Sequence, residues 1–251
     1  MKLDDLGQHP FFIRASRDSI DVQNALGLKM TDDFDDSTTL DELQFYVTRV
    51  GFSMSHTLGW AEQLQHAVHF MTDFGYGKKA SEAGIKRSHH LLYNVENYLI
   101  RLQSVYDRCL QLTNAVFHLC MSSEHVNHGV IVSNLHVERT NTPKLLKAVK
   151  KSIKGEEQER HTLIHKHSHM DPELRRIEMY YMHSEETWGD DKKMPFKNLV
   201  HVRGQLVKKY TTRRKAEFEV MNAELGSALT ALFDGLMVEY NRQKTRLAKI
   251  V

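Results

Sequence analysis

The clearest hydrophobic pattern in the chain lies between residues 82 and 121. Large apolar side chains recur there at intervals of seven residues, so they form adjacent columns along a helix. The columns contain Leu91, Tyr98, Val105, Leu112 and Leu119; Leu92, Leu99 and Tyr106; and Val95, Leu102, Cys109 and Val116. The opposite side is polar and carries Asn97, Arg101, Ser104, Asp107, Arg108 and Asn114. This wide apolar stripe predicts a long helix in the centre of a bundle.

An earlier helix is expected from about residue 39 to 74. Thr39 and Glu42 have the spacing of a capping box at its start, and Gly75 and Gly77 would end it. Its apolar positions, which we expect to be buried, are Leu43, Tyr46, Val50, Phe52, Met54, Leu58, Leu64, Val68 and Met71. Residues 1–38 have no clear periodicity and are interpreted as a poorly defined N-terminal extension, in which Phe11, Phe12 and Ile13 could dock as an apolar anchor.

The rest of the chain also reads as helical. The expected elements are a loop or short hairpin over 122–142, a helix from Thr142 and Pro143 to about His165, a helix starting at Asp171 and Pro172, a loop over 188–198 and a last helix over 207–247. We therefore predict a single all-α domain, a helical bundle over residues 39–251. The apolar area of the central and last helices exceeds what one bundle needs, which predicts a homodimer.

Composition and charge narrow the class of protein. The chain has 251 residues, 41% of them hydrophobic, with only 4 prolines and a net charge of +2. Any nucleic-acid contact must therefore come from local basic patches. The two cysteines, Cys109 and Cys120, fall in the central apolar stretch and are expected to be reduced core thiols. No secretory signal and no run of eighteen apolar residues is visible, so we expect a cytoplasmic protein without a membrane span.

One basic patch lies on the helix that starts at Thr142. Its lysines are Lys144, Lys147, Lys150, Lys151 and Lys154. This face is either simply solvated or placed to meet phosphate groups. Lys147, Lys150, Lys151 and Lys154 are our candidate RNA-binding residues.

The end of the same helix carries the most unusual cation. Arg160 continues the apolar column of Leu146 and Ile153 at intervals of seven residues. A guanidinium in such a column must be paired with a carboxylate, solvated in a cleft or available to an anion. His161 and His165 lie beside it, four residues apart.

One interpretation of this stretch is a metal site. His161 and His165 could share a metal on one helix face, with His167 and His169 close behind. However, Thr162 stands where a helical zinc motif carries glutamate, and no clear third ligand is visible elsewhere. His125 and His128 also have a metal-like spacing but lack partners. We therefore expect neither a metal nor another cofactor.

A second interpretation comes from a resemblance. An all-α bundle with Arg160–His161–Thr162–Leu163–Ile164–His165 near the end of a helix resembles the HEPN superfamily, whose motif is arginine, a polar residue, three variable residues and histidine. His161 fills the polar position, where asparagine is more usual. A helix that opens with Asp171–Pro172–Glu173–Leu174 then follows. The resemblance covers about residues 80–250. A second pair with permitted spacing, Arg176 and His183, reads better as surface charge.

The resemblance implies a metal-independent endoribonuclease that works as a homodimer in a toxin, antiviral-defence or stress setting. The partners that it implies are RNA and an antitoxin or regulatory protein that controls the activity. The catalytic residues that it implies are Arg160 and His165, together with His161. A third interpretation is a HEPN-like bundle that binds RNA, nucleotide or a protein partner without catalysis.

Overall fold

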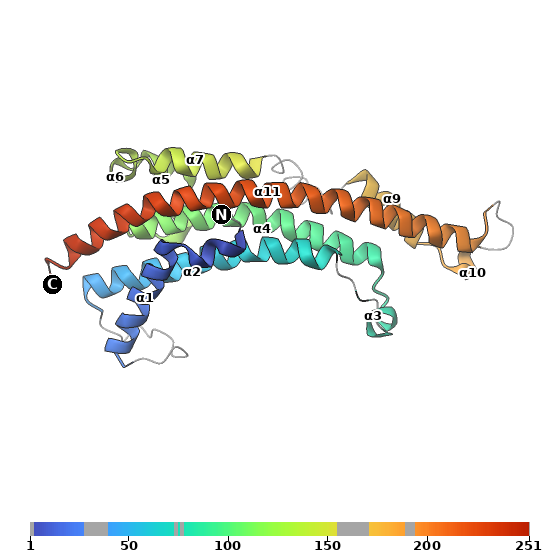
Figure 1. Ribbon diagram of the computed structural model, residues 1–251, viewed down its shortest axis with the longest axis horizontal. Helices are drawn as coiled ribbons and strands as arrows, with labels where there is room; N and C mark the ends of the chain where they lie inside the picture. The colour runs from blue at the N-terminus through green and yellow to red at the C-terminus, as the bar shows by residue number, and fades with distance from the viewer. Residues whose placement is uncertain are drawn as a thin grey trace. The chain divides into compact units, whose positions relative to one another are not determined.

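The computed structural model describes residues 3–27, 40–72, 75, 78–154, 171–188 and 194–250 (Figure 1). All regular secondary structure in these ranges is helical, which confirms the all-α prediction. The helices are η1 (Leu3–Gln8), α1 (Pro10–Ala25), α2 (Glu42–Thr72), α3 (Lys78–Glu82), α4 (Arg87–Val116), η2 (Ser123–His125), α5 (His128–Ser133), α6 (Leu135–Glu138), α7 (Thr142–Ile153), α9 (Pro172–Tyr181), α10 (Glu185–Trp188) and α11 (Phe196–Leu247). No described helix combines the length and hydropathy that crossing a membrane requires.

The chain divides into two compact units, and α2, α4 and α11 contribute to both. Unit 1 consists of Met1–Glu62, Leu102–Lys154 and Ala223–Val251. Unit 2 consists of Gln63–Arg101 and Gly155–Asn222. Unit 1 therefore contains the N-terminal helices and α5 to α7, whereas α3, α9 and α10 belong to unit 2.

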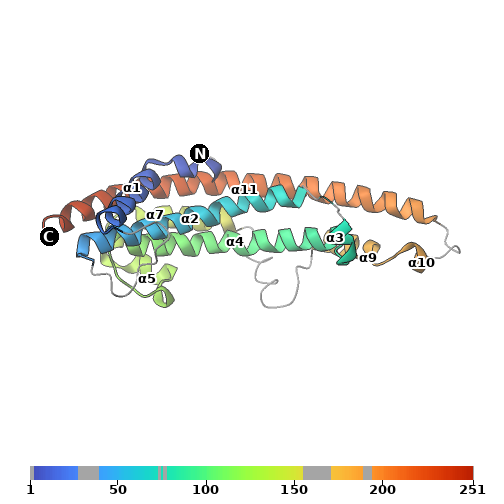
Figure 2. The same cartoon turned by 90° about the horizontal axis from the view of Figure 1, so that it is seen from below.

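In unit 1, α1 packs against α11, as Figure 2 shows. Phe11 is fully buried, with its ring centroid 5.5 Å from that of Tyr240 and 6.4 Å from that of Phe233. Tyr46 of α2 stacks on Tyr240 at 5.7 Å and donates its hydroxyl proton to the Val116 carbonyl at 2.9 Å. The described part of the N-terminal segment thus forms two helices, η1 and α1, in which Phe11 is buried and Ile13 is 41% exposed.

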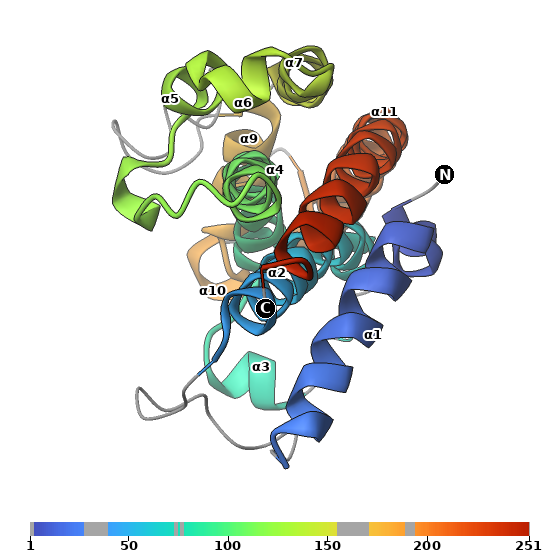
Figure 3. The same ribbon diagram turned by 90° about the vertical axis from the view of Figure 1, so that its left-hand side faces the viewer.

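Helices α5 to α7 lie on the other side of unit 1, where Figure 3 shows them across the bundle from α1. The loop or hairpin expected over 122–142 is wrong, because asparagine caps start successive short helices there. Asn127 Oδ1 accepts the Val130 amide at 3.1 Å, and Asn134 Oδ1 accepts the His136 amide at 3.0 Å. Helix α7 then begins at Thr142 with Pro143 in its first turn, as predicted.

In unit 2, an aromatic stack and a series of buried hydrogen bonds connect the long helices. The Tyr98 ring of α4 stacks on Phe218 of α11 at 3.7 Å, and its hydroxyl donates to Asn222 Oδ1 at 2.9 Å. The Asn222 amide in turn donates to Gln65 Oε1 on α2 at 3.1 Å. Since these side chains come from α2, α4 and α11, one buried network joins the three long helices within this unit.

Several predicted boundaries need correction. Helix α2 is capped by Asp41 and Gln44, whose side chains each accept the other's amide at 2.7 and 3.1 Å, while Thr39 lies outside the described residues. The long helix predicted from 82 to 121 is shorter, because α3 ends before Gly84, which has a φ of +67°, and α4 ends at Val116. Helix α11 begins eleven residues before the predicted 207.

Some burial predictions are also wrong. Phe52 is 65% exposed, because it lies on the side of α2 that faces away from the core. Cys120 is exposed, since α4 ends before reaching it, whereas Cys109 is buried as expected. Asn114 was placed on the polar side of the helix and is only 1% exposed.

Candidate functional site

The predicted catalytic residues lie outside the part of the chain that the structure describes. Arg160, His161 and His165 fall within residues 155–170, as do His167 and His169 of the metal interpretation. The structure therefore describes the elements on either side of the motif. These are α7 before it and the start of α9 after it.

Helix α7 is strongly amphipathic. Its apolar residues Leu146, Val149 and Ile153 are at most 4% exposed and face the bundle. A Cβ built on Gly235 of α11 would come within 2.6 Å of Leu145 Cδ1, so the two helices approach closely in unit 1, and Figure 1 shows them side by side. Five lysines of α7 and its C-cap are exposed: Lys144, Lys147, Lys150, Lys151 and Lys154. This set, the α7 lysine face, presents like charges to solvent, and its RNA-binding role stays a prediction.

The residue that follows the motif segment is anchored to α11. Asp171 caps α9 by accepting the Glu173 amide at 2.9 Å. Its Oδ2 also lies 3.5 Å from Arg213 Nη2 and 3.7 Å from Arg214 Nε. Arg214 is 3% exposed and reaches Glu217 at 3.0 Å. A buried cation of this kind is stable only with such carboxylate partners, so the start of α9 has a fixed position in unit 2.

A hollow of about 810 Å³ in unit 2 gathers several cations near the end of α9. Its lining residues are Lys86, Arg87, Tyr181, His183, Ser184, Glu185, Phe196, Val200, Arg203 and Gly204. The sequence analysis missed this site, because Arg203 lies between the predicted loop over 188–198 and the predicted start of the last helix at residue 207.

The cations of this hollow also serve the fold. Arg203 Nε donates to the Tyr180 carbonyl at 2.8 Å, and its Nη2 donates to the His183 carbonyl. Lys86 Nζ donates to the Tyr181 carbonyl at 2.8 Å. These carbonyls belong to the last turn of α9 and the residues after it, where cations are favourable. Much of the positive charge therefore stabilises the end of a helix.

Arg176 and His183, the second pair with motif-like spacing, have different surroundings. His183 lines the hollow and packs edge-on against Trp188 at 5.2 Å. Arg176 is exposed on α9, with its guanidinium 6.0 Å from the Tyr180 ring, and it is not among the lining residues. The described geometry does not bring the two side chains into one site, in keeping with the surface role expected for Arg176.

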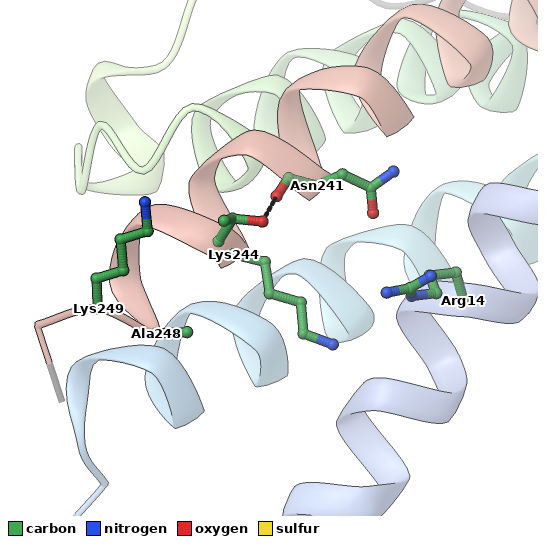
Figure 4. A pocket seen from close by; sticks show the side chains of 6 residues that line it. Arg14, Asn241, Lys244, Ala248 and Lys249 are labelled. Atoms are coloured by element: carbon green, nitrogen blue, oxygen red, sulfur yellow. Dashed lines mark hydrogen bonds between the residues drawn. The ribbon is translucent and has the colours of Figure 1, made fainter.

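A second hollow, of about 540 Å³, lies in unit 1 between α1 and the last turns of α11. It is lined by Arg14, Asn241, Lys244, Thr245, Ala248 and Lys249. In Figure 4, the ends of Arg14 and Lys244 point toward one another across the gap between the two helices. Both contact Asp18 Oδ2, at 3.4 and 2.7 Å, so this carboxylate neutralises part of their charge.

The described residues contain no group of three or more histidine, cysteine or acidic side chains arranged to hold a metal ion. His125 Nδ1 lies 2.9 Å from the Ser122 hydroxyl, and His128 Nδ1 lies 2.5 Å from the Tyr106 hydroxyl. Burial, and then the charge of Lys150, lower the pKa of His128 below its ordinary value. The two histidines therefore have separate partners and do not form the pair that their spacing permits.

The chain matches the HEPN_Cthe2314-like HEPN family over residues 37–231, a range that includes α2 to α10, the motif segment and most of α11. Neither the curated proteins nor the solved structures gave a match. Because the family match covers well over half of the chain, the protein belongs to the HEPN_Cthe2314-like HEPN family.

Proposed function

We propose that this protein is a metal-independent endoribonuclease whose catalytic residues are Arg160 and His165, with His161 beside them. The observation that carries the proposal is the family match, which spans the Arg-x4-His motif at residues 160–165. HEPN domains often act on RNA, and many are ribonucleases. Two further features support it: the α7 lysine face precedes the motif, and the anchored Asp171 follows it.

The proposed reaction needs no metal. The 2′-hydroxyl of the RNA attacks the adjacent phosphorus, and the 5′-oxygen of the next nucleotide leaves. This produces a 2′,3′-cyclic phosphate and a 5′-hydroxyl end. Histidine moves the proton, because its ordinary pKa of ~6.5 lies near neutrality. Arginine holds two phosphate oxygens and stabilises the charge that develops in the transition state.

The active form in this proposal is a homodimer in the cytoplasm. Residues five apart on a helix point about 140° away from each other, so an arginine and a histidine with motif spacing need not serve the same site. A two-fold cleft allows each protomer to supply one of the two groups. The setting that we propose is toxin activity, antiviral defence or stress response, with an antitoxin or regulatory protein as a further partner.

A second candidate function is RNA binding without cleavage. The exposed α7 lysine face favours it, because a row of lysines on one helix side provides sequence-independent affinity for phosphates. This function uses the same surface but requires neither Arg160 nor His165.

The test compares variants on one single-stranded RNA labelled at its 5′ end, in the presence of EDTA. Arg160→Ala and His165→Ala should abolish cleavage without lowering the melting temperature. Arg176→Ala and His183→Ala, the matched pair with the alternative spacing, should cleave at the wild-type rate. Products ending in 2′,3′-cyclic phosphate are expected. Full cleavage by Arg160→Ala would overturn the assignment, and binding without any cleavage would favour the second candidate function.

A further inference from the structure

Three side chains of unit 1 form a continuous chain of contacts. The Sγ atom of Cys120 lies 3.8 Å from Nδ1 of His118. On the other side of the same ring, Nε2 of His118 lies 2.5 Å from Oε1 of Glu42. One imidazole therefore connects a thiol to a carboxylate through its two nitrogens. We refer to these three residues as the thiol triad.

The turn after α4 brings two members of the thiol triad together. The His118 amide donates to the Ala115 carbonyl at 3.0 Å, and the Leu119 amide donates to the Asn114 carbonyl at 3.1 Å. This is the hydrogen-bond pattern that ends many helices with a residue at positive φ. His118 has a φ of +52° and Cys120 a φ of +54°, and they are the non-glycine residues with positive φ among those described.

The buried Asn114 fixes the rest of this turn. Its Nδ2 donates to the Met121 carbonyl at 2.9 Å, and its Oδ1 accepts the Met121 amide at 3.2 Å. Because Met121 is held on both sides, the intervening segment has little freedom. Side-chain-bearing residues held at positive φ are found at helix ends and also cluster at functional sites.

The imidazole is held on its faces as well as at its nitrogens. The side chain of His118 is 9% exposed, and its ring packs edge-on against Tyr46 at 5.3 Å and near Phe45 at 6.3 Å. Glu42 is the first residue of α2, and Cys120 is exposed to solvent. A reachable nucleophile, a base and a carboxylate that orients the base are the parts of an activated nucleophile.

We propose that Cys120 is a reactive thiol, deprotonated by His118 and supported by Glu42, whose co-reactant is a small peroxide. The sulfur attacks one oxygen of hydrogen peroxide and the O–O bond breaks. The departing hydroxide takes the proton that His118 received from the thiol and becomes water. Cys120 is oxidised by two electrons to sulfenic acid, and the peroxide is reduced.

Two observations favour a small reactant and this product. Cys120 is exposed and lines neither the 540 Å³ nor the 810 Å³ hollow, which suits a reactant that can reach the thiol directly from solvent. Cys109, the other cysteine of the chain, is fully buried, and burial raises its pKa far above the ordinary value. It is therefore unsuited to attack the sulfenic acid and form a disulfide within the chain.

A simpler role would be purely structural, with Glu42 and His118 joining α2 to the turn and Cys120 beside them by accident. The two roles differ in the chemistry of the thiol. An ordinary cysteine is only a few per cent thiolate at pH 7, so a neighbouring base leaves room for about a tenfold gain in rate. A structural ion pair would affect melting temperature and leave the thiol ordinary.

The test measures the rate at which iodoacetamide, and separately hydrogen peroxide, modifies Cys120 in the full chain at pH 7, by intact mass and peptide mapping. Cys109 is the internal control and should remain unmodified. The rate at Cys120 should fall about tenfold in His118→Asn, a variant that keeps a residue tolerant of positive φ. It should also fall in Glu42→Gln. His125→Asn, an exposed histidine in the same connection, should react like the wild type.

Melting temperatures keep the outcome interpretable, because they show whether each variant is folded. If His118→Asn is folded and its Cys120 reacts as fast as in the wild type, the proposal is overturned. Equal reactivity of Cys109 and Cys120 would overturn it as well. If Glu42→Gln changes the melting temperature but not the rate, the carboxylate has only the structural role.

Discussion

The carboxylate of Asp18 on α1 accepts a hydrogen bond from the Tyr240 hydroxyl on α11 at 2.7 Å. The same oxygen lies 2.7 Å from Lys244 Nζ and 3.4 Å from Arg14 Nε. Burial alone would raise the pKa of Asp18, but hydrogen bonds from Lys244 and Tyr240 and the charges of Lys244 and Arg14 lower it below its usual value of 3.8. The attachment of α1 to the bundle is therefore sensitive to acid.

The first prediction concerns this attachment. Because the folded-state pKa of Asp18 lies below the unfolded value, its contribution to stability is present above about pH 4 and is lost as pH falls through the folded value. Asp18→Asn should lower the free energy of unfolding by about 1–3 kcal/mol at pH 7, and the loss should shrink in acid. Urea unfolding at pH 7 and pH 3 measures both. Asp21→Asn, an exposed position on the same helix, should change little.

The second prediction concerns His9, which is 2% exposed. Its Nδ1 accepts the Phe11 amide at 3.1 Å, so Nε2 carries the proton and faces Asp234 at 3.2 Å. Burial lowers the pKa of His9 below 6.5, against the opposing effect of Asp234. The unfolded chain then takes up its proton first, and stability should fall as pH drops below 6.5.

His9→Asn tests this interpretation, since asparagine can still cap α1 but does not titrate. Unfolding free energies between pH 7.5 and 5.5 should depend less on pH in this variant than in the wild type. The dependence should not vanish, because burial also lowers the pKa of His90 and His128. An identical pH dependence in both proteins would contradict the assigned role.

The third prediction uses two glycines of α2. A Cβ on Gly51 would lie 2.7 Å from Ser19 Cβ and 3.3 Å from the Ala15 carbonyl, whereas Gly59 has nothing within 4 Å. Alanine inside a helix is about 1 kcal/mol more favourable than glycine. Gly59→Ala should therefore stabilise the protein, and Gly51→Ala should destabilise it by forcing α1 away. Thermal unfolding of the two variants should shift in opposite directions.

The sequence was sufficient to predict burial where apolar side chains repeat with the period of a helix. Leu91, Tyr98 and Val105 repeat every seven residues, and all three are buried. Asn114 is equally buried but polar, because its side chain bonds to Met121. Periodicity gives no sign of such a bond. The apolar columns also continue past the point where α4 ends, which explains why Cys120 was wrongly placed in the core.

Contacts between distant parts of the chain were beyond sequence reasoning. Glu42 and His118 are separated by 76 positions, and Asp18 and Tyr240 by 222. Only the packing of the helices brings them together, and neither pair carries a local motif. The Arg-x4-His motif shows the opposite case, since the spacing of Arg160 and His165, their position near a helix end and the all-α pattern are all visible in the sequence. Their roles stay predictions, because they lie outside the described residues.

The fourth prediction concerns the α7 lysine face and rests on the proposed function. If Lys147 and Lys151 each contact a phosphate, replacing either by alanine should reduce the slope of log affinity against log salt by about 1. Binding to different RNA sequences should weaken equally, because phosphate contacts carry no sequence information. Lys208→Ala and Lys209→Ala, exposed lysines of α11, provide the control and should leave the slope unchanged.

The fifth prediction is the assembly state. If the protein is a homodimer, light scattering at micromolar concentration should give a mass twice that of the 29.2 kDa monomer. A mixture of Arg160→Ala and His165→Ala should then regain part of the lost cleavage, because mixed dimers restore one complete site. A mass of one protomer at all concentrations, or no recovery in the mixture, would argue against a shared site.

The turn after α4 also has a consequence for protein engineering. Glycine adopts positive φ without steric cost, so replacing His118 by glycine would relieve roughly 1 kcal/mol of backbone strain. The exchange would also remove the packing of the imidazole on Tyr46 and its contact with Glu42, so the relief of strain is opposed by lost contacts. Cys120 would lose its neighbouring imidazole at the same time. Variants that relax this turn should therefore be checked for their response to oxidants before they replace the natural protein in any assay.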